Sequence, residues 1–117
     1  MMSYEIWHGR ILDAARDIAS REFQEEAWFP GGRVRSSPDE VYQVLMEDCT
    51  ADLFFQIYGG RLTEAQLHSW YKLRSDLQAY YIQEPPYPDP DEVLKDPAWY
   101  LVRQSATSFI RAFSSSE

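Results

Sequence analysis

Tyrosines, prolines and acidic residues are concentrated between positions 80 and 92, where three, four and four of them occur. The prolines fix φ and remove N–H donors, so we expect an extended segment here. Rigid aromatic side chains give contact area at low entropic cost, and carboxylates around them attract basic proteins. We therefore predict a protein-contact surface made of Tyr80, Tyr81, Glu84, Tyr87, Asp89, Asp91 and Glu92. The alternative is a structural crossover whose tyrosines cover the end of a bundle and whose acids cap the next helix.

This region also resembles part of a known family. The sequence Asp76-Leu77, then Tyr80-Tyr81, then prolines and acids, is similar to the Asp-Leu-Ile-Tyr-Tyr-Pro stretch of the colicin nuclease immunity proteins. Two residues separate the leucine from the tyrosines where the family has one, and Ile82 stands where the family has proline. Members of that family are small, acidic, four-helix proteins. The resemblance implies that this segment binds and blocks a basic nuclease toxin.

Residue combinations that support catalysis are incomplete. Helical di-iron proteins use two Glu-x-x-His motifs with further glutamates, and this chain does not contain two. If they met in the fold, Cys49 and His68 could act as a nucleophile and its base. Cys49, however, falls in the middle of an expected helix and on its apolar stripe, which favours a buried, unreactive thiol. We expect no metal, no cofactor and no enzymatic activity.

Two Gly-Gly-Arg runs, Gly31-Gly32-Arg33 and Gly59-Gly60-Arg61, each precede an expected helix. Backbone N–H groups and arginines at such places bind anions in some proteins. Neither run matches a phosphate-loop or dinucleotide pattern, so we expect the glycines to end the preceding helices. Binding of an anion or another small ligand stays open as an alternative.

Composition restricts the possible partners. The chain has 117 residues, with 19 acidic and 11 basic side chains and a net charge of −8. Such a charge repels nucleic acids and anionic membranes and attracts basic proteins. The single cysteine excludes an internal disulfide, and we see neither a secretory signal nor an apolar run of membrane-spanning length. These features favour a cytoplasmic protein that does not enter a membrane.

Hydrophobic periodicity and capping residues predict an all-α bundle in one domain, residues 1–117. We expect about four main helices, a short helical turn and a Pro-rich crossover before the last helix. Their expected ranges are 4–28, 37–58, 63–81, the turn from 90, and a final helix from 97. The starts are marked by Ser37-Pro38-Asp39-Glu40, Thr63-Glu64-Ala65-Gln66, Asp89-Pro90-Asp91-Glu92 and Asp96-Pro97.

The function that these features favour is inhibition of a basic partner by occlusion. The protein would be an immunity protein, antitoxin or phage-type inhibitor, and its partner a toxin, a nuclease or a nucleic-acid-binding complex. Mimicry of nucleic acid by rows of carboxylates is one variant of this mechanism. The alternatives are an adaptor or subunit of a larger helical assembly and a small-ligand binder. A homodimer is compatible with each of them.

Overall fold

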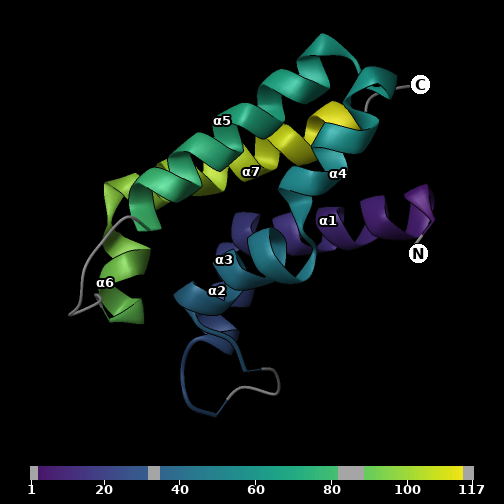
Figure 1. Ribbon diagram of the computed structural model, residues 1–117. Helices are drawn as coiled ribbons and strands as arrows, with labels where there is room; N and C mark the ends of the chain where they lie inside the picture. Colours follow the sequence, from purple (N-terminus) through teal and green to yellow (C-terminus); the bar gives the residue numbers. More distant parts are fainter. Residues whose placement is uncertain (1–2, 32–34, 82–88, 115–117) are drawn as a thin grey trace.

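The computed structural model describes residues 3–31, 35–81 and 89–114 (Figure 1). These ranges are helical and contain no strand, which confirms the predicted all-α class. The elements are α1 (Tyr4–Ala19), α2 (Arg21–Ala27), α3 (Pro38–Gln43), a π-helical turn (Val44–Asp48), α4 (Ala51–Tyr58), a 3-10 turn (Gly59–Arg61), α5 (Glu64–Tyr81), α6 (Pro90–Lys95) and α7 (Pro97–Ser114).

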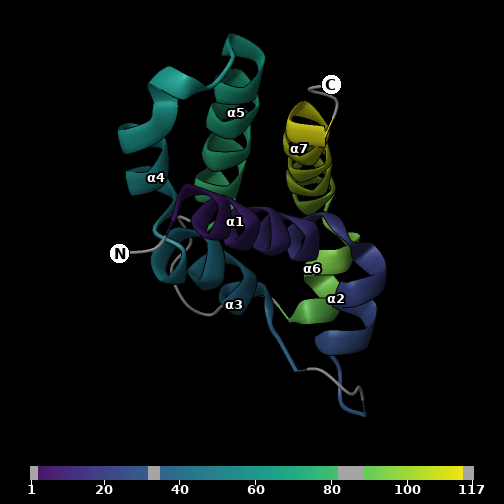
Figure 2. The same cartoon turned by 90° about the vertical axis from the view of Figure 1, so that its right-hand side faces the viewer.

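Helix α7 packs against both α5 and α1, and Figure 1 shows it between these two helices. Its buried stripe includes Trp99, Val102, Ala106 and Phe109, which recur at the three- and four-residue spacing of an amphipathic helix. The short helices α2, α3 and α6 all lie in the lower half of both views, and α3 stands apart from α6 (Figures 1 and 2). No helix in the described ranges is long and apolar enough to cross a membrane.

The prediction of one helix over residues 4–28 is wrong, because the chain breaks at Ser20. Ser20 has an extended backbone, and its Oγ accepts a hydrogen bond from the N–H of Phe23, so it starts α2. The Gln24 side chain then turns back to the end of α1, where its Nε2 donates to the carbonyls of Asp17 and Ile18. The break is therefore stabilised by polar groups that replace the missing helical hydrogen bonds.

The prediction of a continuous helix over residues 37–58 is also wrong. The helix widens into the π-helical turn, ends at Cys49, and restarts after Thr50, which has the left-handed φ of 45°. The carbonyl of Cys49, released by this break, accepts a hydrogen bond from Trp7 Nε1 at 2.6 Å. Gly59 does not end α4 in a left-handed conformation, since it has φ −54° and continues into the 3-10 turn.

Substitution of Thr50 by asparagine is expected to raise the free energy of unfolding by about 1 kcal/mol. A β-branched residue is disfavoured at a left-handed φ, which asparagine tolerates better. Urea denaturation of the purified variant measures the change. Thr63→Asn is the control, because Thr63 is a helix cap and asparagine serves equally well there. A Thr50 variant that is less stable than the wild type would contradict this account of the bend.

The predicted helix starts are confirmed by their hydrogen bonds. Ser37 Oγ accepts from the N–H of Glu40 at 3.1 Å. Thr63 and Gln66 form a reciprocal capping box, with bonds of 3.0 and 3.1 Å. Local capping chemistry therefore fixes where these helices begin, even where tertiary contacts decide where they break.

Candidate protein-contact surface

The residues predicted to contact a partner lie in different environments. Tyr80 is buried, and Asp89, Asp91 and Glu92 are exposed at the start of α6. Tyr81 is the last residue of α5, and its side chain lies outside the described part of the structure. Glu84 and Tyr87 also lie outside the described residues. Among the described members of the predicted set, the structure therefore brings Asp89, Asp91 and Glu92 together.

Tyr80 belongs to the core, which corrects its expected place on the surface. Only 7% of the residue is exposed, and its ring centroid lies 5.4 Å from that of Trp99. Asp96 lines the same cleft as Tyr80, and its carboxylate acts on the ionisation of the Tyr80 hydroxyl group. Burial, followed by the charge and hydrogen bond of Asp96 and the charge of Glu92, raises the pKa of Tyr80 to about 12. Tyr80 supports the acidic surface from beneath, and its ring is not available to a partner.

The raised pKa of Tyr80 makes stability depend on alkaline pH. In the unfolded chain tyrosine ionises near its ordinary pKa of about 10, whereas in the folded protein it keeps its proton to about 12. Raising the pH through this window therefore favours the unfolded state. Between about pH 8 and about pH 11, we expect Tyr80 to account for a loss of roughly 1 kcal/mol. Urea denaturation of the wild type and Tyr80→Phe measures it, and equal pH dependence in both proteins would contradict this assignment.

The acids of α6 also perform the capping role of the alternative prediction. Glu92 Oε1 accepts from the N–H of Asp89 at 3.0 Å, and Asp91 forms an ion pair with Lys95. These bonds use part of each carboxylate and leave all three residues exposed. Capping and surface presentation are therefore compatible for this short helix.

The three short helices in the lower half of the ribbon carry exposed acids that we call, together, the acidic end (Figures 1 and 2). Its members are the exposed acids of α2, α3 and α6 with the cap of α6: Glu22, Glu25, Glu26, Asp39, Glu40, Asp89, Asp91 and Glu92. The basic residues on these three helices, Arg21 and Lys95, form ion pairs with Glu25 and Asp91. The acidic end therefore has a net negative charge that the described residues on these helices do not neutralise.

A cleft of about 270 Å³ lies beside Tyr80, where α5 ends and α7 begins. Two carboxylates, Asp76 and Asp96, line it together with the apolar side chains Ala79, Ala98 and Leu101. Asp76 accepts hydrogen bonds from Lys72 and Ser105, and Asp96 accepts one from the N–H of Ala98. An apolar wall beside carboxylates suits the aliphatic stem and charged head of a lysine or arginine.

Sequence analysis did not assign Asp96 or Leu101 to the contact surface. The sequence could have placed Asp76 near Tyr80, because Asp76 precedes Tyr80 by four residues and so lies on the same side of α5. The position of Asp96 next to Tyr80 depends on the path of the chain between α5 and α6. Local sequence patterns do not specify that path.

The other chemical candidates lie in separate environments. Cys49 is buried as predicted, burial raises the pKa of its thiol, and the exposed His68 lines a different groove. Glu5 and His8 have Glu-x-x-His spacing, but the His8 ring stacks on Phe54 at 5.7 Å. The described ranges contain no group of three or more metal-ligating side chains.

The second Gly-Gly-Arg run is explained by packing. Gly59–Arg61 form the 3-10 turn, and the Arg61 guanidinium lies 4.1 Å from the centroid of the Tyr4 ring. In the first run, Gly31 has a positive φ of 95°, while Gly32 and Arg33 are outside the described residues. The arginine of the second run therefore stabilises the junction of α1 with the end of α4.

Comparison with known proteins finds no match: no family model, no curated protein and no solved structure is similar to this chain. The candidate surface therefore depends on its own geometry and charge.

Proposed function

We propose that this protein binds a basic protein through the acidic end and blocks it by occlusion. The observation that carries the proposal is the presence of eight exposed acidic residues on three short helices that lie in the same half of the molecule. Charges of one sign on one surface steer a partner of opposite charge and fix its orientation. The packing of α7 against α1 and α5 would support this surface in the complex.

The cleft beside Tyr80 gives the proposal a specific contact. A lysine or arginine of the partner would place its charged head between Asp76 and Asp96, with its stem along Leu101. Leu101 is 53% exposed, so a partner would also cover apolar area there. Charge would then direct the encounter, and the filled cleft would slow dissociation.

In this proposal the protein acts by binding and not by catalysis. An immunity protein, antitoxin or phage-type inhibitor acting in the cytoplasm fits this mode of action. The carboxylates of α2, α3 and α6 would occupy the partner surface that otherwise holds nucleic-acid phosphates, if the partner is a nuclease or a nucleic-acid-binding complex. The isolated protein would be a monomer or homodimer.

An adaptor in a helical assembly is the second candidate, and α4 favours it. Leu53 and Ile57, one turn apart on α4, are 47% and 55% exposed. Neighbouring exposed apolar side chains are common where another subunit covers a helix. Sedimentation of the purified protein over a range of concentrations separates the candidates, because an uncovered subunit would form assemblies larger than a dimer, whereas an inhibitor would stay a monomer or dimer.

Affinity capture tests the first candidate. The tagged wild type, incubated with an extract of its native cell at low and high salt, should retain one basic protein that high salt releases. The same capture with Glu26→Lys/Asp91→Lys should lose that protein, whereas Glu5→Lys/Glu64→Lys should keep it. These two variants change the net charge equally, from −8 to −4. Retention of the same proteins by all three would contradict binding through the acidic end.

A further inference from the structure

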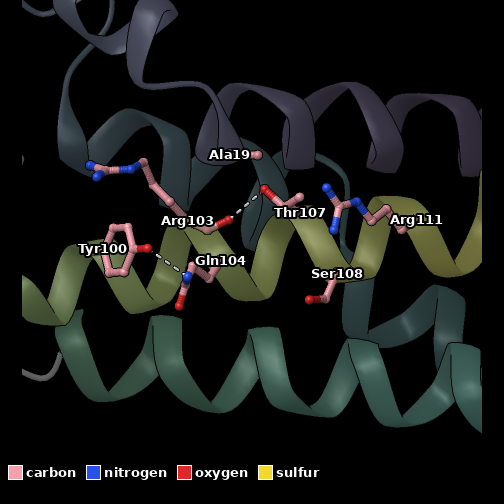
Figure 3. Close-up of a pocket in the computed structure, with 7 residues that line it drawn as sticks. All are labelled: Ala19, Tyr100, Arg103, Gln104, Thr107, Ser108 and Arg111. Carbon is pink, nitrogen blue, oxygen red and sulfur yellow. Dashed lines mark hydrogen bonds between the residues drawn. The ribbon is translucent and has the colours of Figure 1, made fainter.

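A groove of about 490 Å³ on α7 has a lining unlike the rest of this acidic protein (Figure 3). Its lining residues are Ala19, Tyr100, Arg103, Gln104, Thr107, Ser108 and Arg111. Two of them are arginines, four carry neutral polar groups, and none is acidic. A carboxylate-free lining with two guanidinium groups is unexpected on a chain with a net charge of −8.

Arg103 is the most unusual of these residues. It is 9% exposed, and its Nη1 is buried without a hydrogen-bond partner among the described residues. Its guanidinium lies 5.6 Å from the centre of the Tyr100 ring, which gives a cation–π contact but no hydrogen bond. Burial of an arginine with an unsatisfied N–H is costly, and an anion in the adjoining groove would lower that cost.

The neighbouring polar groups present hydrogen-bond donors. Gln104 Nε2 donates to Tyr100 Oη at 2.8 Å, so the phenolic O–H can donate elsewhere. The amide of Gln104 keeps a second N–H, and Ser108 adds a hydroxyl group. Thr107 already donates to the carbonyl of Arg103. The groove therefore contains charged hydrogen-bond donors, the guanidinium groups, and neutral donors, the phenol, amide and hydroxyl groups.

Spacing along α7 indicates the size of the ligand. Figure 3 shows the guanidinium groups of Arg103 and Arg111 toward the two ends of the groove, with Thr107 between them. At about 1.5 Å of helical rise per residue, the Cα atoms of these arginines are about 12 Å apart. Because the two guanidinium groups lie toward opposite ends of the groove, a ligand with two phosphate groups suits them better than a single phosphate ion does. The volume also falls in the range of small-ligand sites.

We propose that this groove binds a small molecule with a diphosphate group, held by Arg103 and Arg111. The site is on the face between α1 and α7 and does not depend on the protein-binding function proposed above. Within the groove, guanidinium groups pair with phosphate oxygens bidentately. The remaining donors, on Tyr100, Gln104 and Ser108, would bind the rest of the ligand.

Calorimetric titration of the purified protein with inorganic pyrophosphate and with ADP tests this site, with sodium chloride of matched ionic strength as the blank. We expect saturable binding that Arg111→Gln weakens about tenfold. The matched control is Arg10→Gln, since Arg10 is also exposed and its carbonyl contacts Cys49, on the α4 side of α1. Tighter binding of ADP than of pyrophosphate would identify an organic diphosphate as the ligand class.

Two results would overturn the proposal. One is heat no greater than that of sodium chloride at about 10 mM of either probe, well above ordinary metabolite affinities. The other is equal weakening by Arg111→Gln and Arg10→Gln, which would indicate general screening of charge. Circular dichroism of Arg111→Gln confirms folding, which we expect to be unchanged because the side chain is exposed.

Discussion

Replacement of Gln24 by alanine is expected to lower the free energy of unfolding by about 3–5 kcal/mol, a large share of the stability of an ordinary domain. Gln24 is 0% exposed, and its amide is bonded on both sides. Its Nε2 donates to two carbonyls of α1, at 2.9 and 2.8 Å, and its Oε1 accepts from Trp99 Nε1 at 3.0 Å. Alanine would remove all three hydrogen bonds and create a cavity between α1, α2 and α7.

Urea denaturation of the variant measures this loss. Gln56→Ala provides the matched control, because Gln56 is exposed on α4 and its replacement should change stability by less than about 0.5 kcal/mol. Gln24→Glu distinguishes the acceptor role of the amide from its donor role, since glutamate keeps an acceptor for Trp99 but lacks both N–H donors. It should also destabilise the protein strongly. A loss below about 1 kcal/mol in either Gln24 variant would contradict the role of this side chain in stabilising the break.

The second large effect is expected on association with the basic partner. Glu26→Lys/Asp91→Lys should slow association at low salt by about tenfold or more, because the variant reverses charge on two helices of the acidic end. Glu5→Lys/Glu64→Lys should slow it by no more than about threefold, since these residues start α1 and α5. The first variant should also lose most of its dependence on salt.

Stopped-flow mixing with the captured partner gives both rates. The comparison removes the effect of net charge, because both double variants carry −4 where the wild type has −8. Similar slowing by the two variants would mean that the partner responds to total charge and not to the acidic end. Thermal denaturation of each variant confirms that exposed charge changes have left the fold intact.

The helix starts were predictable from the sequence, and the helix breaks were not. Caps such as Ser37 and Thr63 act through residues three positions away, so the signal is local. Ser20 caps α2 in the same local way, through Phe23, but apolar residues continue at helical spacing on both sides of it, so the periodicity predicts one continuous helix. Gln24 stabilises that break through Trp99, which is 75 positions away in the chain. A contact at such separation cannot be inferred from periodicity.

The candidate surface was predictable in part for the same reason. Exposure of Asp89, Asp91 and Glu92 follows from their position at the start of a short helix. Burial of Tyr80 had a signal as well, since it lies on the apolar stripe of Leu73 and Leu77, but the prediction gave it a contact role. Assembly of α2, α3 and α6 at one end depends on tertiary packing. The sequence alone gives the charges of these helices but not the positions of the helices relative to one another.

Hydrogen exchange measured by mass spectrometry, on the protein alone and saturated with its captured basic partner, tests the central proposal most directly. If the acidic end is the contact surface, slowed exchange should concentrate in peptides covering α2 (Arg21–Ala27) and α6 (Pro90–Lys95). The π-helical turn and the start of α5 should exchange as they do in the free protein. Protection confined to α4 and the start of α5, with α2 and α6 unchanged, would contradict binding through the acidic end.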